Sequence, residues 1–335
     1  MKRIWRAALP AALAAALMLT GCGGGTKAVK VRLNEVTHSV FYAPQYAALE
    51  LGYFADEGLE IELTNGGGAD KVMTAVVSGQ SDIGLAGGES CIYVYNQGKE
   101  DHPLIFAQLT RRDGSFLVGR TDAPFSWEDL RGKTVIGGRL GGMPEMTLEH
   151  VLRQNGLEPG VDVTVDTSIQ FNMMAGAFTG GSGDYVALFE PSATQVASAG
   201  QGYILRSLGE ESGDVPYTCY FASQSFLKDR ADTVQKFTDA VARGQKWVAE
   251  HTDEEVAAVI APQFPDTDPA AVAAVVGRLR SIGAWNTDPV MESSAWERLE
   301  TIMIGAGQLA EADKVPFETL VTNEFNLVIA AYHIT

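Results

Sequence analysis

The residues best suited to chemistry near the start of the chain are a histidine and a serine in the stretch VTHSVFYAPQYAALEL, residues 36–51. His38 can exchange a proton near neutral pH, and Ser39 can act as a nucleophile or as a hydrogen-bonding group. A hydrolytic triad with Glu35 is not indicated, because the three residues are too close together in one segment and no G-x-S-x-G motif is present. His38 and Ser39 are therefore candidates for ligand recognition, with helix capping as the alternative for His38.

The same stretch carries two tyrosines. Tyr42 and Tyr46 are four residues apart, so on a helix they would share one face. Core packing explains at least one of them. Tyr42 is nearer to the loop and is the better candidate for stacking on a planar ligand, and Pro44 fits the first turn of a helix that would begin just after it.

A glycine-rich turn with polar residues follows the apolar run 83–86. Gly88 allows the backbone to approach a ligand closely. Glu89 or Ser90 could form a hydrogen bond with the ligand or cap the helix that follows. We therefore count Gly88, Glu89 and Ser90 among the candidate ligand-binding residues.

A second glycine-rich loop, residues 137–142, leads into a helix that Pro144 would open. Its candidate ligand-binding residues are Arg139, Gly141, Gly142 and Met143. Free N–H groups at a helix N-terminus can bind an anion. Here proline removes one donor and the glutamate that follows it would repel an anion, so this loop disfavours an anionic ligand.

Glu190 follows a third apolar run, residues 185–189. A carboxylate at this place can accept hydrogen bonds from the amino group of a heterocycle or from a cation. Asn172 and Tyr220 could add polar edges to the same site or be structural. Together these residues favour a planar ligand that bears an amino group or is uncharged.

Apolar and amphipathic runs alternate along the chain and must position these residues. Their lengths and periods predict strands at 29–36, 59–63, 83–86, 133–137, 161–165 and 185–189, and helices at 44–57, 69–78, 144–154, 231–251, 254–260, 269–282 and 293–306. The β-α-β-α order predicts an α/β fold with mostly parallel sheets flanked by helices. In such sheets the loops at the carboxyl ends of the strands line the ligand crevice, where the candidate residues would meet.

The N-terminus is typical of an exported protein. A short basic segment precedes the apolar run 7–19, and the sequence LTGC that ends at Cys22 resembles a bacterial lipobox. Residues 1–21 are predicted to be a lipoprotein signal peptide, Cys22 to carry the lipid, and residues 22–28 to form a flexible tether. An ordinary secretory signal with a chance cysteine is the alternative.

The chain is strongly acidic. It has 25 basic and 42 acidic side chains, a formal net charge of −17, and removal of the signal peptide with its three basic residues would give −20. Such a charge argues against nucleic acid and anionic lipid as partners.

Two further cysteines, Cys91 and Cys219, lie far apart in the sequence. Their spacing gives no disulfide framework, so we expect two separate buried thiols. No C-x-x-C or H-E-x-x-H motif occurs, and no metal site or cofactor is expected.

Several separated motifs resemble those of one family. They are THS at 37–39, LGYFADEGLEI at 51–61, VSGQSDIG at 77–84, LRGKTV at 130–135 and LFEP at 188–191. In type and order they are similar to extracytoplasmic solute-binding proteins of ABC importers, in the branch that handles nitrate, sulfonates, taurine and the pyrimidine precursor of thiamine. The likeness runs from about residue 31 to the C-terminal helices.

This resemblance implies a two-lobed fold like that of type II periplasmic binding proteins, with the ligand held between the lobes. Each lobe would be a mostly parallel sheet flanked by helices, and two hinge crossings would fall near residues 111–119 and 217–223. Lobe 1 would then be discontinuous and consist of residues 29–115 and 220–335. Lobe 2 would consist of residues 116–219.

The resemblance also implies a function. We expect a monomeric receptor, anchored by lipid to the outer face of the bacterial cytoplasmic membrane, that delivers a small solute to the transmembrane subunits of an ABC permease and is not an enzyme. The polar residues favour a planar amino-bearing heterocycle such as a thiamine pyrimidine precursor. The alternatives are an anionic solute (alkyl sulfonate, taurine or nitrate), an enzyme of the same fold similar to pyrimidine synthases, and a lipoprotein that has lost the ligand cleft.

Overall fold

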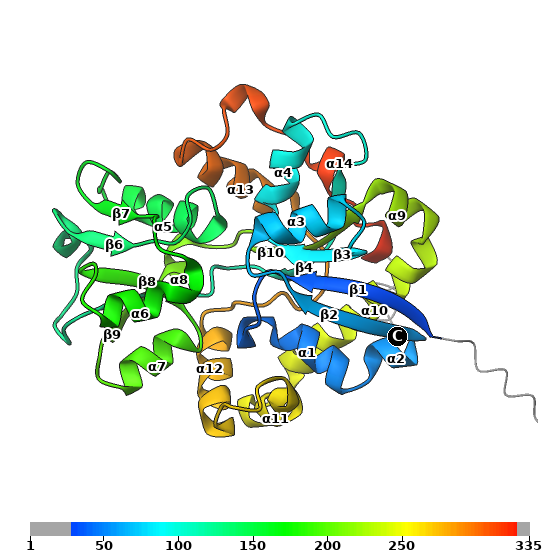
Figure 1. Cartoon of the computed structure of the whole chain (residues 1–335), viewed down its shortest axis with the longest axis horizontal. Coiled ribbons are helices and arrows are strands. Elements are labelled where there is room, and N and C mark those ends of the chain that lie inside the picture. Colours follow the sequence, from blue (N-terminus) through cyan, green and yellow to red (C-terminus); the bar gives the residue numbers. More distant parts are fainter. Residues whose placement is uncertain (1–27, 327–335) are drawn as a thin grey trace, which may run out of the picture.

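Two five-stranded sheets lie side by side along the long axis of the molecule, each with its own helices (Figure 1). The computed structural model describes residues 28–326. The predicted signal peptide, the lipidation site at Cys22 and nearly all of the predicted tether lie outside the described residues.

The sheet of lobe 1 has the strand order β2-β1-β3-β10-β4. β1 pairs in parallel with both β2 and β3, and β10 runs antiparallel between β3 and β4. The strands are β1 (Val29–Glu35), β2 (Leu59–Asn65), β3 (Ile83–Ala86), β4 (Pro103–Thr110) and β10 (Thr218–Ser223).

The sheet of lobe 2 repeats this plan with the order β7-β6-β8-β5-β9. β6 pairs in parallel with β7 and β8, and β5 runs antiparallel to β8 and β9. The strands are β5 (Ser115–Gly119), β6 (Thr134–Ile136), β7 (Thr164–Asp166), β8 (Tyr185–Phe189) and β9 (Tyr203–Ser207). The α/β fold predicted from the sequence is therefore confirmed, with one antiparallel strand inside each sheet.

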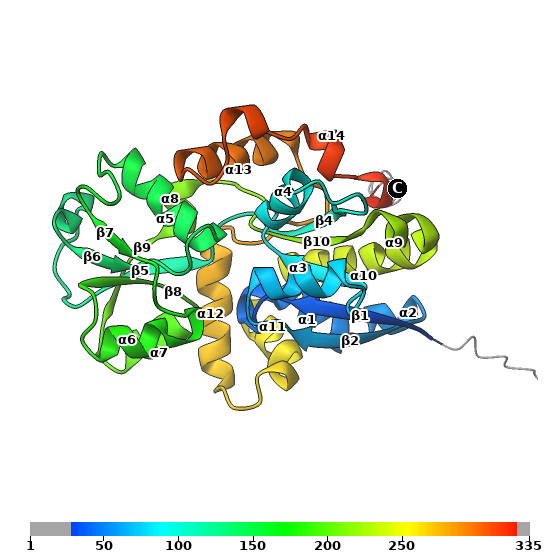
Figure 2. The ribbon, with the colours of Figure 1, turned by 45° about the horizontal axis from the view of Figure 1, so that its top comes forward.

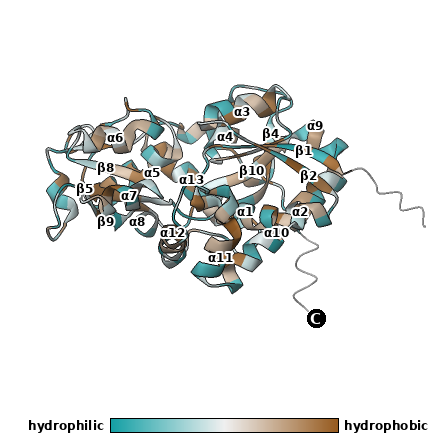
Figure 3. Cartoon of the chain, turned by 60° about the horizontal axis from the view of Figure 1, so that its bottom comes forward, coloured by the Kyte–Doolittle hydropathy of each residue, from teal (hydrophilic) through white to brown (hydrophobic). Residues whose placement is uncertain are grey.

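Helices cover both faces of each sheet, and the ribbon is coloured hydrophobic along much of the strands (Figure 3), whose residues are largely buried. Lobe 1 carries α1 (Ala43–Glu50), α2 (Tyr53–Asp56), α3 (Ala69–Val77), α4 (Glu89–Asn96), α9 (Gln224–Asp229), α10 (Ala231–Glu250), α11 (Asp253–Ile260) and α14 (Phe317–Leu320). Lobe 2 carries α5 (Met143–Gln154), α6 (Met174–Thr179), α7 (Ser192–Ser198) and α8 (Leu208–Ser212). Short 3-10 helices are η1 (Val40–Tyr42), η2 (Trp127–Leu130), η3 (Phe171–Met173), η4 (Ala261–Gln263), η5 (Glu311–Asp313) and η6 (Glu324–Asn326).

Two C-terminal helices, α12 (Pro269–Ser281) and α13 (Ser293–Gly305), lie at the boundary between the lobes (Figures 1 and 2). α13 contacts α4 of lobe 1 and α5 of lobe 2. α12 contacts η1, and its Arg278 forms an ion pair of 3.2 Å with Glu190 of lobe 2. The C-terminal region therefore connects to both lobes.

Two short segments, residues 111–114 and 213–217, cross between the lobes. Val215 donates its N–H to the Arg111 carbonyl at 2.8 Å, and Asp214 pairs with Arg111 and with Arg112. The predicted crossings at 111–119 and 217–223 were too long, because most of their residues belong to β5 and β10. Ser115 accordingly lies in the sheet of lobe 2, and residues 218–219 lie in the sheet of lobe 1, contrary to the predicted boundaries.

Two predicted elements differ from those observed. The helix expected at 44–57 is divided into α1 and α2, because Gly52 has a left-handed φ of 75° that ends the first helix. The strand expected at 161–165 is shorter, because β7 begins at Thr164 and Val161 lies in a turn with 82% of its surface exposed.

Candidate functional site

The carboxyl ends of β1, β3, β6 and β8 all face the boundary between the lobes, where the two lobes contact each other directly. The Ser39 hydroxyl donates to the main-chain oxygen of Glu190 at 2.9 Å. The Tyr93 hydroxyl donates to the Gly141 carbonyl at 2.9 Å, and Arg139 pairs with Asp70 at 2.7 Å. Loops predicted to line a crevice therefore lie together, as expected for parallel strands.

An aromatic cluster spans this boundary. The Phe41 ring from lobe 1 lies 5.8 Å from the ring of Phe189 from lobe 2 and 5.8 Å from Tyr217 on a crossing segment. Tyr42 is 5.6 Å from Phe41, and Phe171 is 5.4 Å from Phe189. These centroid distances are typical of favourable aromatic pairs, so the cluster offers planar surfaces to a planar ligand.

Gly114 makes room for this cluster. A Cβ atom on Gly114 would lie 2.5 Å from the Phe41 ring, closer than any carbon atoms can pack. The crossing segment therefore needs glycine at this position, because any larger residue would displace Phe41.

Glu89 begins α4 and points its carboxylate into the boundary. It is 3% exposed, and its Oε2 atom has no hydrogen-bond partner among residues 28–326. Burial raises the pKa of Glu89 to about 7, although the N–H groups of Glu89 and Met143 and the charge of Arg139 oppose this shift. A buried carboxylate of this kind can accept a hydrogen bond from a ligand.

Asp113 on the first crossing is a second buried carboxylate. Its Oδ1 atom accepts the Ser115 N–H at 2.6 Å, whereas its Oδ2 atom has no partner in the described chain. Burial raises the pKa of Asp113 to about 6. Burial and the charge of Asp113 raise the pKa of Tyr217 well above its usual value, and the charge of Glu89 acts in the same direction. Tyr217 therefore lies near both carboxylates.

The N-terminus of α5 is poorly suited to an anion. The Gly141 N–H donates to the Glu145 carboxylate at 3.0 Å, and Pro144 has no N–H to offer. Gly142 is the residue before the helix, and Met143 is buried with its N–H near Glu89. Arg139, the nearest cation, is half exposed and paired with Asp70.

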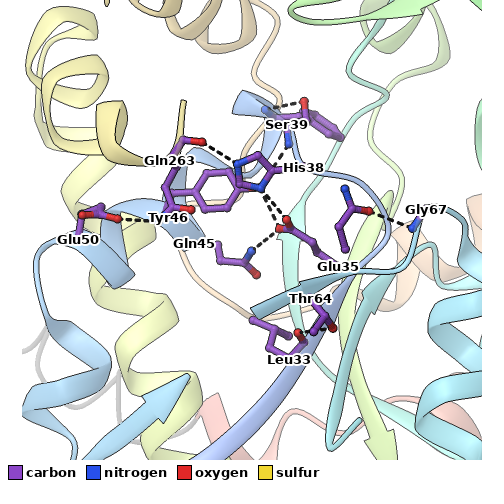
Figure 4. A network of polar contacts seen from close by, with 12 residues as sticks. Leu33, Glu35, His38, Ser39, Gln45, Tyr46, Glu50, Thr64, Gly67 and Gln263 are labelled. Carbon is purple, nitrogen blue, oxygen red and sulfur yellow. Dashed lines mark hydrogen bonds and ion pairs between the residues drawn. The ribbon is translucent and has the colours of Figure 1, made fainter. Parts of the chain in front are cut away.

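His38 is held inside lobe 1 (Figure 4). Its Nδ1 lies 2.7 Å from the Glu35 carboxylate, and its Nε2 lies 2.9 Å from the Gln263 carbonyl. Because both neighbours are acceptors and Tyr46 donates its own hydrogen to Glu35, the geometry favours a doubly protonated imidazolium. The hydrogen bond with Glu35 is the main reason that the pKa of His38 is raised. Neither ring nitrogen is directed at the aromatic cluster.

Two other predicted ligand residues are also fully engaged within the protein. The Glu190 carboxylate accepts the N–H and the hydroxyl of Thr194, both at 2.9 Å, and pairs with Arg278. The Tyr220 hydroxyl donates to Gln45 at 2.9 Å in the core of lobe 1. The expectation that the Glu190 side chain accepts ligand hydrogen bonds loses its support here, because both carboxylate oxygens already have partners within the protein.

Three further predicted ligand residues, Ser90, Gly88 and Asn172, make no contact with the aromatic cluster among those described above. Ser90 bonds the Gly87 carbonyl and so stabilises the first turn of α4. Gly88 packs near Ile105 and Leu299, and Asn172 is exposed on η3. Of the predicted residues, Tyr42 packs on Phe41 in the aromatic cluster, the charge of Glu89 acts on Tyr42, and the N–H of Met143 lies near Glu89.

Four residues that complete this site are not among the ligand residues predicted from the sequence: Phe41, Phe189, Tyr217 and Asp113. Phe41 and Phe189 each adjoin a predicted site residue, so a wider interpretation of the same strand ends would have included them. Asp113 stands out in the sequence only as one of three charged residues at the predicted crossing, where its charge could serve the hinge or the ligand, and nothing in the local sequence distinguishes Tyr217.

The expectation for the cysteines is confirmed, since Cys91 and Cys219 are both buried free thiols. Within residues 28–326 no group of three or more His, Cys, Asp or Glu residues is placed to hold a metal ion. Among the helices of that same range, none is both long and apolar enough to cross a membrane.

The two-lobed fold is that of extracytoplasmic solute-binding proteins. The nitrate-binding protein NrtA from Synechocystis PCC 6803 superimposes with a TM-score of 0.73 at 17% identity, covering 92% of this chain and 89% of that one. The alkanesulfonate-binding protein SsuA from Xanthomonas axonopodis pv. citri, bound to MOPS, gives a TM-score of 0.71 at 16% identity, covering 88% and 99%. An enzyme shares the fold as well: the desulfurization enzyme DSZB gives 0.64 at 15% identity, covering 91% and 99%.

The chain belongs to the NMT1/THI5-like family, whose model matches residues 40–255. It is 43% identical over 307 residues to a candidate binding protein, YtlA, of Bacillus subtilis (strain 168), covering 91% of each chain. The family resemblance expected from the motifs is therefore confirmed.

Proposed function

We propose that this protein is the solute-binding receptor of an ABC importer and that it binds a planar, amino-bearing heterocycle, such as a thiamine pyrimidine precursor, between its two lobes. The observation that carries this proposal is the buried carboxylate of Glu89, whose Oε2 atom is unpartnered in the described chain and lies beside the aromatic cluster. A planar ring can stack on Phe41 or Phe189 while its amino group donates to Glu89. The names of the related proteins support the receptor role.

The charge at the site argues against an anionic solute. Glu89 and Asp113 are both buried there, and Glu145 occupies the N–H of Gly141 where an anion would bind. An anion brought to this position would be repelled by these carboxylates, with little screening by water. Nitrate and sulfonate are therefore the weaker candidates, although structural neighbours bind them.

A thermal-shift screen of the purified mature protein tests the choice of solute. We expect 4-amino-5-hydroxymethyl-2-methylpyrimidine to stabilise the protein by about 2.7 kcal/mol at 100-fold excess over its dissociation constant. Sodium nitrate and ethanesulfonate should give no shift at the same ionic strength. Stabilisation by either anion and none by the pyrimidine would contradict the heterocycle proposal.

Recovery of the bound pyrimidine separates a receptor from an enzyme. We expect mass spectrometry to return the added compound chemically unchanged after long incubation with the protein. A modified pyrimidine would instead indicate catalysis by this chain.

The proposed location is the outer face of the cytoplasmic membrane, with a lipid on Cys22. The motif that ends at Cys22 supports it. We expect the wild-type protein in the membrane fraction and the Cys22→Ala variant outside it. Equal distribution of both proteins would contradict lipid anchoring.

A further inference from the structure

Two buried carboxylates at the lobe boundary, Glu89 and Asp113, form no ion pair within residues 28–326. Glu89 is 3% exposed and Asp113 is fully buried, and each has one oxygen without a hydrogen-bond partner in the part of the chain that the structure describes. Leaving a buried charge uncompensated costs several kcal/mol. Such an arrangement is expected where a ligand supplies the missing donor.

Within residues 28–326, no lysine or arginine forms an ion pair with either carboxylate. Among the described residues, Arg139 is the cation whose charge opposes the raised pKa of Glu89, and it is half exposed and paired with Asp70. Asp113 receives only the Ser115 N–H in that part of the chain, although the nearby Tyr217 hydroxyl helps to lower its pKa. The other titratable groups that face Glu89 or Asp113 are neutral when protonated: Tyr42, Tyr93, Tyr217, Cys91 and Cys219.

Tyr217 connects the two carboxylates. Its buried hydroxyl has no hydrogen-bond partner of good geometry within residues 28–326, and the charges of Asp113 and Glu89 both act on it. Its ring packs on Phe41 and Phe189, at 5.8 Å and 6.1 Å. Tyr217 therefore connects the aromatic cluster with the two acidic groups at the boundary between the lobes.

We propose that Glu89 and Asp113 form a two-carboxylate site that selects a planar solute with two separated hydrogen-bond-donating groups, at least one of them positively charged. This inference rests on the proposed function and narrows its solute class. One donor of the solute meets Glu89 on lobe 1, and the other meets Asp113 on the first crossing. Because Asp113 lies on a crossing, its contact with the solute also links binding to the hinge.

A matched pair of solutes tests this selection by isothermal titration calorimetry. The first is 4-aminopyrimidine with a neutral 5-hydroxymethyl group, and the second carries a 5-aminomethyl group, which is cationic at pH 7. We expect wild type to bind the cationic compound roughly 10- to 100-fold more tightly, the usual effect of a charged hydrogen bond. The Asp113→Asn variant should reduce this preference to about 3-fold or less.

The variants are chosen to preserve the local structure. The Asp113→Asn change keeps a side-chain oxygen that can accept the Ser115 N–H, so the crossing should retain its conformation. Glu211 is an exposed residue on α8 without an ion-pair partner in the described residues, so Glu211→Gln serves as the charge-matched control. We expect this control to keep the wild-type preference.

Two further probes are putrescine, which is a linear diamine, and sodium nitrate. They distinguish failure of the two-carboxylate site from failure of the proposed receptor for heterocycles. Equal affinity for both pyrimidines, or an unchanged preference in Asp113→Asn, would overturn the two-carboxylate site but leave the receptor for heterocycles intact. Binding of putrescine without either pyrimidine would overturn both the heterocycle and the selection of a planar solute. Binding of nitrate alone, or of none of the probes, would overturn both.

Discussion

The Ser39 side chain donates a hydrogen bond across the two lobes, to the main-chain oxygen of Glu190 at 2.9 Å. Both atoms are at strand ends, after β1 and after β8, and Ser39 is only 4% exposed. The same hydroxyl accepts the N–H of Phe41 at 3.2 Å. One small side chain thus joins the lobes and positions the first turn that carries the aromatic cluster.

Replacing this serine should weaken the contact between the lobes. We expect Ser39→Ala to lower the free energy of unfolding by about 1 kcal/mol, because the Glu190 carbonyl loses its partner. Small-angle scattering of the ligand-free variant should show a larger radius of gyration. Ser281→Ala is the control, since that hydroxyl bonds within its own helix; the same scattering change in both variants would contradict the role of Ser39.

The Glu89 carboxyl makes stability depend on pH. Burial raises its pKa from 4.5 to about 7, so the folded state binds more protons than the unfolded state between these values. Its contribution to stability therefore falls as the pH rises from 4.5 to 7 and remains low above 7. We expect Glu89→Gln to flatten this slope in denaturation measured from about pH 5 to 8.

The same Glu89→Gln variant should bind its solute less well. Loss of the charged acceptor should weaken binding roughly 10- to 100-fold, as calorimetry at about pH 8 would measure. Stability at that pH should not decrease, because the variant no longer buries a charge. Wild-type affinity in Glu89→Gln would remove this residue from the site.

His38 should act on stability more than on binding. Its pKa is raised mainly by the hydrogen bond with Glu35, so the folded state holds the proton more tightly than the unfolded state. This stabilisation is present below the unfolded value of 6.5 and is lost as the pH rises through the higher folded value.

We therefore expect His38→Gln to be more destabilised, relative to wild type, near about pH 5.5 than near about pH 9 in urea denaturation. Its solute affinity should stay within about 3-fold of wild type. An equal deficit at both pH values, or a large loss of affinity, would instead favour a direct role of His38 in binding.

Gly114 should tolerate no side chain. A Cβ atom would lie 2.5 Å from the Phe41 ring, so Gly114→Ala should cost about 1–3 kcal/mol and weaken solute binding by displacing the ring. Chemical denaturation and calorimetry measure the two effects. In Gly176→Ala, where a Cβ atom meets nothing within 4 Å, we expect no loss of stability; similar losses in both variants would contradict the packing argument.

Much of the fold could be predicted because its signals are local. The runs at 83–86 and 185–189 are continuous apolar strands with turn residues on both sides, and they match β3 and β8 residue for residue. The strands β5 and β10 are predicted only as strand-like crossings between the lobes, not as members of the sheets. They pair antiparallel with strands far along the chain, and no local period marks that pairing.

The sequence by itself determined the alternation of strands and helices, and with it the gathering of polar residues at the carboxyl ends of parallel strands. Only the tertiary structure decided which of those residues are free to bind a solute. His38 forms a hydrogen bond with the carbonyl of Gln263, 225 residues away, and Glu190 forms an ion pair with Arg278 on α12. Glu89 and Asp113 each keep one oxygen without a partner in the described chain, because hydrogen bonding depends on the packing of distant segments, which no local pattern encodes.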